Sequence, residues 1–140
     1  MKSLKFEEIL ETISGKDQRY HRDAYIFMRE ALEYTQSSMG TSKRENVRHI
    51  SGGELLEGIR RFALDQFGPM VTTVLSEWGI QSCEDFGELV FNMVEHNLLA
   101  KTERDSRDDF KGGYTFFDAF RKPYLPTGHQ QYPEPKSVRV

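Results

Sequence analysis

The chain has 140 residues, of which 37% are hydrophobic and 29% charged, and its formal net charge at pH 7 is −3. This length and composition predict one globular domain with a buried core, which excludes a disordered chain and a large multidomain enzyme. The single cysteine, Cys83, excludes an internal disulfide. No apolar run could cross a bilayer and the N-terminus turns acidic where a signal peptide would be apolar, so we expect a cytoplasmic protein without membrane contact.

Two helices are predicted before residue 40. Apolar residues recur at helical spacing over residues 4–14, and Gly15 follows as a stop signal. A longer apolar arc covers residues 17–36 and includes Tyr20. Residues 37–48 are small, polar and charged without a period, so we expect a connection or an interaction loop there.

Capping signals predict three further helices. Ser51 and Glu54 have the spacing of a capping box and start a helix that extends to Phe67. The following Gly68-Pro69 pair predicts a tight corner before a helix over residues 69–78. Ser82 caps the last helix, residues 83–96, with Asp85 at its third helical position and with Asn97 as its left-handed end.

The two strand-like segments 98–102 and 110–117 surround a polar tip and predict a β-hairpin. Three helices followed by a hairpin have the order of a winged helix-turn-helix. We therefore expect a mainly α fold with a small β-hairpin (α+β), in which a winged-helix-turn-helix-like core follows an N-terminal helical pair. The domain covers residues 1–122, and residues 123–140, which contain four of the five prolines, form an extended or disordered tail.

Charge argues against DNA reading by the last predicted helix. Residues 51–100 contain two Lys or Arg against eight Asp or Glu, and neither of these two basic residues lies between residues 81 and 100. Acidic side chains near phosphates would oppose the counterion release that drives such binding. The helical pattern places Asp85, Glu88, Asn92 and Glu95 on the side facing solvent, where we expect an ordinary hydrated surface.

Nucleic-acid binding, most naturally of RNA, stays open through basic residues elsewhere in the chain. Each basic cluster has acidic neighbours, Asp17 and Asp23 in one case and Glu45 in the other, which favour ordinary ion pairs instead. This alternative requires the clusters to converge on one surface. The candidate contacts are Arg19, Arg22, Lys43, Arg44 and Arg48.

The residues of catalysis and metal binding are sparse. The four histidines are not paired, and Cys83 lacks the second thiol that a zinc site would usually use, so we expect no metal and no cofactor. A small enzyme or ligand-binding protein is a further alternative. It would need a pocket that contains His21, Cys83 or His96 beside a carboxylate.

The apolar arc of the last predicted helix is wider than a helix with one buried side needs, because Phe91 broadens it. The leading hypothesis is therefore a non-enzymatic protein-interaction or regulatory module that binds another protein or a second copy of itself. The candidate interface residues are Tyr25, Trp78, Phe86, Phe91 and Val94.

Several unusual strings occur in one order along the chain, namely residues 19–25, 49–70, 78–80, 84–88 and 105–110. With them the chain resembles an uncharacterised bacterial protein family of unknown function, over about residues 15–123. The resemblance implies a one-domain bacterial protein and no particular activity, cofactor or site residue. The winged-helix prediction comes from the spacing of the elements and is independent of this resemblance.

Overall fold

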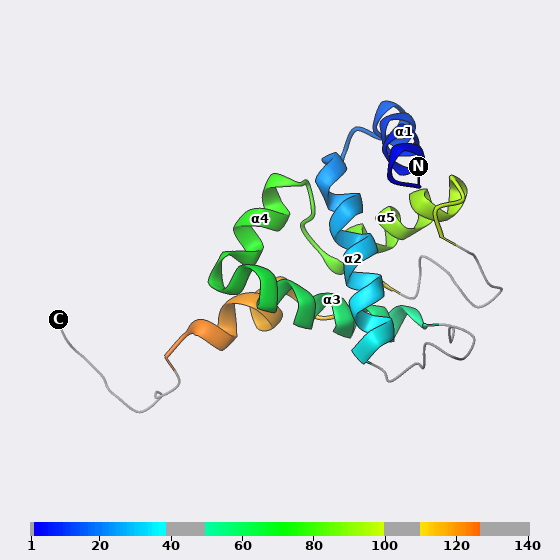
Figure 1. The fold of residues 1–140 in the computed structure, drawn as a ribbon. Helices are drawn as coiled ribbons and strands as arrows, with labels where there is room; N and C mark the ends of the chain where they lie inside the picture. Colours follow the sequence, from blue (N-terminus) through cyan, green and yellow to red (C-terminus); the bar gives the residue numbers. More distant parts are fainter. Residues whose placement is uncertain (1, 39–49, 100–109, 127–140) are drawn as a thin grey trace.

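The computed structural model describes residues 2–38, 50–99 and 110–126, which are helical apart from short connections (Figure 1). Before residue 40 the structure differs from the predicted helices at residues 17–21. These residues connect the first two helices, whereas the prediction placed them in the second helix. The elements are α1 (Lys2–Lys16), α2 (Arg22–Ser38), α3 (Gly52–Phe67), η1 (Gly68–Met70), α4 (Val71–Glu77), α5 (Cys83–Glu95), η3 (Phe117–Arg121) and η4 (Lys122–Tyr124).

The predicted helix boundaries around α3 and α5 are confirmed. Ser51 Oγ accepts a hydrogen bond from the backbone N–H of Glu54 at 3.1 Å, and the Ser51 N–H donates to Glu54 Oε1 at 3.0 Å. Gly68 ends α3 with a φ of 53°, and Asn97 follows α5 with a φ of 64°. Local capping chemistry therefore sets these boundaries.

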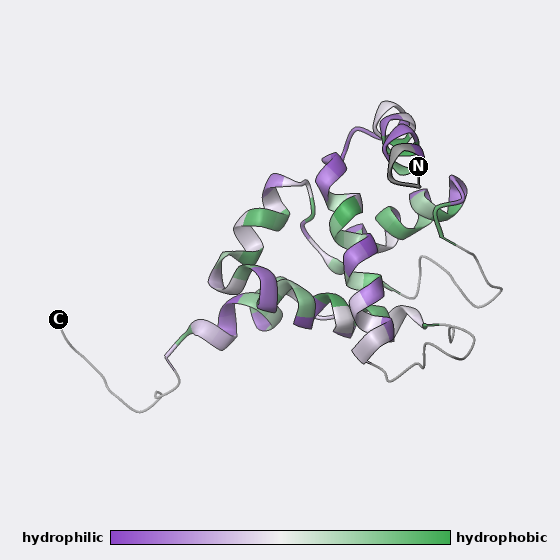
Figure 2. Ribbon diagram, in the orientation of Figure 1, coloured by the Kyte–Doolittle hydropathy of each residue, from purple (hydrophilic) through white to green (hydrophobic). Residues whose placement is uncertain are grey.

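Helix α2 lies at the centre of the molecule, where it packs against α1, α3 and α5. Figure 2 shows apolar and hydrophilic residues alternating along α2 and α3, as expected for helices with one buried side. At the crossing of α2 and α3, a Cβ on Gly58 would lie only 1.7 Å from Thr35 Oγ1. The absence of a side chain at residue 58 thus allows the two backbones to approach closely.

Two aromatic clusters fill the core. Phe27 of α2 has its ring 5.5 Å from the rings of both Phe62 and Trp78, which joins α2 to α3 and to the end of α4. In the second cluster, Phe116 lies 5.6 Å from Phe86 of α5 and 5.2 Å from Phe120. The second cluster holds the C-terminal segment against α5 as part of the same core.

The predicted β-hairpin is wrong. The described residues contain no strand: Leu98 and Leu99 form bends after α5, and Phe116–Tyr124 is helical. The winged-helix core and the α+β class are wrong with it, since the described part of the chain is all-α. Residues 100–109 of the predicted hairpin and residues 127–140 of the predicted tail lie outside the described residues. The first residues of that predicted tail, Pro123 and Tyr124, belong to η4.

The strand pattern misled because the buried aromatics of the second predicted arm have tertiary partners that the sequence does not show. Tyr114 precedes the helical turns, and its hydroxyl donates to the backbone carbonyl of Leu56 in α3 at 2.7 Å. Phe120 is 1% exposed inside the helical turns. A short aromatic run is compatible with a strand or with a buried helical turn, and here packing on α3 and α5 decides for the turn.

No helix among the described residues is long and apolar enough to span a membrane.

Candidate functional site

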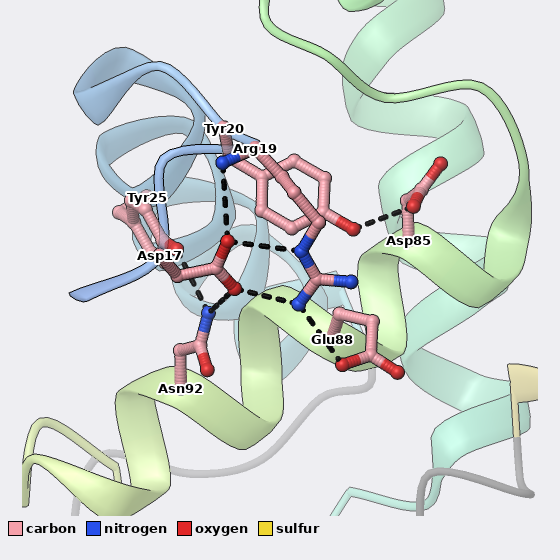
Figure 3. Close-up of polar contacts among 7 residues, drawn as sticks. All are labelled: Asp17, Arg19, Tyr20, Tyr25, Asp85, Glu88 and Asn92. Atoms are coloured by element: carbon pink, nitrogen blue, oxygen red, sulfur yellow. Dashed lines mark hydrogen bonds and ion pairs between the residues drawn. The ribbon is translucent and has the colours of Figure 1, made fainter. Parts of the chain in front are cut away.

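The connection between α1 and α2 meets α5 in a network of polar side chains, which we call the Arg19 junction (Figure 3). Asp17 is its centre. Its carboxylate accepts from Arg19 Nη2 at 2.6 Å, from Arg19 Nε at 2.9 Å and from Asn92 Nδ2 at 2.9 Å. Arg19 Nη2 also donates to Glu88 Oε1 at 3.3 Å. The junction consists of Asp17, Arg19, Tyr20, Tyr25, Asp85, Glu88 and Asn92.

Tyr20 and Tyr25 extend the Arg19 junction toward the core. The Tyr20 hydroxyl donates to Asp85 Oδ1 at 2.5 Å, and Asn92 Nδ2 donates to the Tyr25 hydroxyl at 3.0 Å. Burial raises the pKa of both tyrosines, and for Tyr20 the hydrogen bond to Asp85 raises it further. Both phenols therefore remain neutral hydrogen-bonding groups at physiological pH.

The sequence predicts an ordinary hydrated surface on the polar side of α5, but three of its four residues are half-buried and bind other side chains. Asp85, Glu88 and Asn92 bind the residue 17–20 connection. Asp85 also accepts from the backbone N–H of Gln81 and of Ser82, so one carboxylate both caps α5 and holds Tyr20. Glu88 binds Arg19, which lies 69 positions away in the sequence, and Asp85 binds Tyr20, which lies 65 positions away. No local sequence pattern could indicate these pairings.

Gly79 allows this connection to approach the corner between α4 and α5. Its φ is 91°, and a Cβ there would lie 2.2 Å from the backbone oxygen of Arg19. Beside it, the backbone N–H of His21 donates to the carbonyl of Trp78 at 3.1 Å. The Arg19 junction is thus built into the fold by backbone as well as side-chain contacts.

The predicted RNA contacts are described in part. Arg19 is paired with Asp17 and Glu88, and Arg22 Nη2 lies 2.8 Å from Glu7 Oε1. Both arginines therefore already bind carboxylates of this chain. Lys43, Arg44 and Arg48 lie outside the described residues, so convergence of the two clusters stays a prediction.

The five predicted interface residues lie in different environments. Tyr25 and Phe86 are 0% exposed, so the core holds both and neither is available on the surface of this structure. Trp78, Phe91 and Val94 are half-buried. Trp78 packs with its ring 5.9 Å from that of Phe67, which assigns it a core role as well.

Cys83 lies at a hollow of about 350 Å³ formed by the start of α5 and residues 110–116. Glu84 lines the same hollow, so a thiol and a carboxylate do meet there, as the ligand-binding alternative requires. The Cys83 thiol donates to the carbonyl of Tyr114 at 3.3 Å, and burial raises its pKa to about 11. A buried thiol with a raised pKa is a poor nucleophile near neutral pH, so the arrangement does not favour catalysis by Cys83.

No group of three or more potential metal ligands occurs within residues 2–38, 50–99 and 110–126.

An exposed apolar surface, which the sequence analysis missed, lies where the C-terminal segment crosses the start of α4. Met70 is 54% exposed, Phe117 53%, Tyr124 47% and Leu125 42%, and these are the large hydrophobic residues with high exposure in the described part of the chain. We call these four residues the C-terminal patch. Their separation in sequence hid the patch, since only the fold brings residue 70 beside residues 117–125.

Packing places the two parts of the C-terminal patch together. Helical turn η3 contacts η1, α3 and α4, and in Figure 1 the C-terminal helix (orange) lies beside the start of α4. At the far end of this helix, the Tyr124 hydroxyl lies 3.8 Å from the position that a Cβ on Gly68 would occupy. Met70 and the exposed side of the C-terminal helix therefore share one end of the molecule.

Comparison with known proteins adds no relative: no family model, no curated protein and no solved structure matches the chain.

Proposed function

We propose that this protein is a protein-interaction module and that the C-terminal patch is its contact surface. The observation that carries the proposal is that Met70, Phe117, Tyr124 and Leu125 are each more than 40% exposed. They lie on η1 and on the C-terminal segment that packs against it. Monomeric proteins commonly scatter exposed apolar residues singly, whereas a contiguous patch of them marks an interaction site. Methionine and aromatic residues are also enriched in interface cores.

The packing of the helix that carries Phe117 and Tyr124 supports a role of the patch as a contact surface. Ala119 and Phe120, in the same helical turn as the exposed Phe117, are buried, and Tyr114 is hydrogen-bonded to Leu56. The helix that presents Phe117 and Tyr124 is thus held by the core. A binding surface on a rigid support loses less conformational entropy when a partner binds.

The proposal is tested by affinity capture of the tagged chain from its native cells after nuclease treatment, with mass spectrometry of the captured proteins. We compare the wild type with the variant Met70→Ser/Phe117→Ser, which makes the patch polar. The matched control is Thr73→Ala/Lys16→Ala, which alters two exposed positions outside the patch.

We expect at least one protein that the wild type and the control capture and the patch variant does not. Circular dichroism must show that both variants are folded. Capture profiles that do not differ between the wild type and the folded patch variant would overturn the proposal. Nucleic acid that elutes from the untreated sample, with loss of all partners on nuclease treatment, would instead favour RNA binding.

A further inference from the structure

Two cations flank the C-terminal patch. Arg121 and Lys122 are exposed and have no ion-pair partner among the described residues. Arg121 is about one helical turn from both Phe117 and Tyr124, and this spacing places it on the same side of the helical turns as these two residues. The patch therefore combines apolar anchors with a positive charge that forms no ion pair with any described residue.

This local charge contrasts with the middle of the chain. The described C-terminal residues 110–126 contain the cations Lys111, Arg121 and Lys122 against the single carboxylate Asp118. Residues 51–100 have two basic residues against eight acidic ones, and the whole chain has a net charge of −3. The apolar patch thus lies in a slightly basic segment that follows an acidic middle region.

We infer that the occupant of the C-terminal patch is an acidic amphipathic segment of a partner protein, with apolar side chains on the patch and carboxylates against Arg121 and Lys122. This inference rests on the proposed function and specifies the chemistry of the partner. Complementary charge at the rim of an apolar contact selects the partner and speeds encounter. Arginine is the cation best suited to the role because its planar group binds a carboxylate through two hydrogen bonds and also stacks on aromatic rings.

The size of the patch favours a short segment over a second copy of the chain. Four partly exposed side chains of these types present on the order of 400 Å², about half of the roughly 800 Å² that each partner contributes to a stable interface. An amphipathic helix needs only a few apolar anchors on one side, which matches the four residues of the patch.

The distribution of charge favours a peptide over an anionic membrane. A bilayer is a broader surface than a bound segment, so it would come close to more of the acidic residues 51–100, which have an excess of six negative charges. A bound segment interacts mainly with charges within a Debye length of about 8 Å at physiological salt. Only the basic segment would then determine the attraction.

To test this inference, we select peptides of about 15 residues from a displayed library with the full chain as bait. We then measure the affinity of each selected peptide for the chain. We expect the selected peptides to combine apolar residues at helical spacing with a net negative charge. The variant Arg121→Glu/Lys122→Glu should weaken their binding about tenfold or more, because it replaces attraction by repulsion. The control Lys16→Glu, at the end of α1, changes the total charge away from the patch and should leave affinity unchanged.

The outcomes separate this inference from the proposed function. Selected peptides that are neutral or basic, and that lose binding in Met70→Ser/Phe117→Ser, would overturn the acidic partner and keep the interaction module. Failure to select any peptide that depends on the patch would count against both. Binding to vesicles of phosphatidylserine and phosphatidylcholine that Phe117→Ser abolishes would assign the patch to membranes and overturn the inference.

Discussion

The Arg19 junction and the C-terminal patch each have an arginine near a tyrosine, Arg19 in the junction and Arg121 beside the patch. The two arginines differ in whether a carboxylate of the described chain binds them. Arg19 lies over the ring of Tyr20 and binds Asp17 and Glu88. Arg121 lies in sequence between the exposed Phe117 and Tyr124 and has no ion pair with any described residue. An arginine whose carboxylates come from its own chain contributes to the fold, whereas one among exposed apolar residues is available to a partner.

The largest expected difference is between two phenylalanines of the C-terminal helix. Phe120 is 1% exposed and Phe117 is 53% exposed. Phe120→Ala should lower the free energy of unfolding by about 3–5 kcal/mol, because it leaves a cavity beside the rings of Tyr114 and Phe116. Phe117→Ala should change it by less than about 0.5 kcal/mol. Urea unfolding followed by circular dichroism measures both, and equal losses would mean that the patch is part of the core.

A second comparison concerns two glycines with positive φ. Gly79→Ala should lower the free energy of unfolding by about 2–4 kcal/mol, because it adds a clash with the Arg19 backbone to the strain of a left-handed residue. Gly112 has a φ of 70° and nothing within 4 Å of its added Cβ. Gly112→Ala should therefore show only the strain, about 1 kcal/mol. Similar losses in the two variants would contradict the tight approach of residue 79 to the Arg19 junction.

Sequence reasoning could locate the helices but not this junction or the patch. The helix caps join residues three positions apart, Ser51 with Glu54 and Ser82 with Asp85, so the sequence alone can predict them. Arg19 and Glu88 are 69 residues apart, and Met70 and Phe117 are 47 apart, so only the packed fold pairs them. For the same reason Tyr114, bound to Leu56 across the core, resembled part of a strand.

The pH dependence of stability tests the contribution of Asp17 to the Arg19 junction. The hydrogen bonds from Arg19 hold the pKa of Asp17 well below its ordinary value of 3.8. The folded state therefore binds this proton less readily than the unfolded state does. The stabilisation by Asp17 is complete above about pH 4 and is lost as the pH falls through the lowered folded-state pKa.

We expect Asp17→Asn to lower the free energy of unfolding by about 1–3 kcal/mol at pH 7, because an amide group would face the donors of Arg19 and Asn92. The difference from the wild type should shrink between about pH 4 and pH 2. Urea unfolding at several pH values measures it. The control Asp65→Asn changes an exposed carboxylate and should follow the wild type within about 0.5 kcal/mol. A difference that stays constant with pH would contradict the ion pair.

The smallest expected effect addresses the two arginines directly. Arg19→Gln removes a partly solvated ion pair and should lower the free energy of unfolding by about 1 kcal/mol, with a smaller loss at high salt. Arg121→Gln removes a charge with no partner among the described residues and should change stability by less than about 0.5 kcal/mol at any salt concentration. Urea unfolding at low and high salt compares them. If Arg121→Gln destabilises the chain as much as Arg19→Gln, Arg121 supports the fold, and its charge is no longer free to recognise an acidic partner.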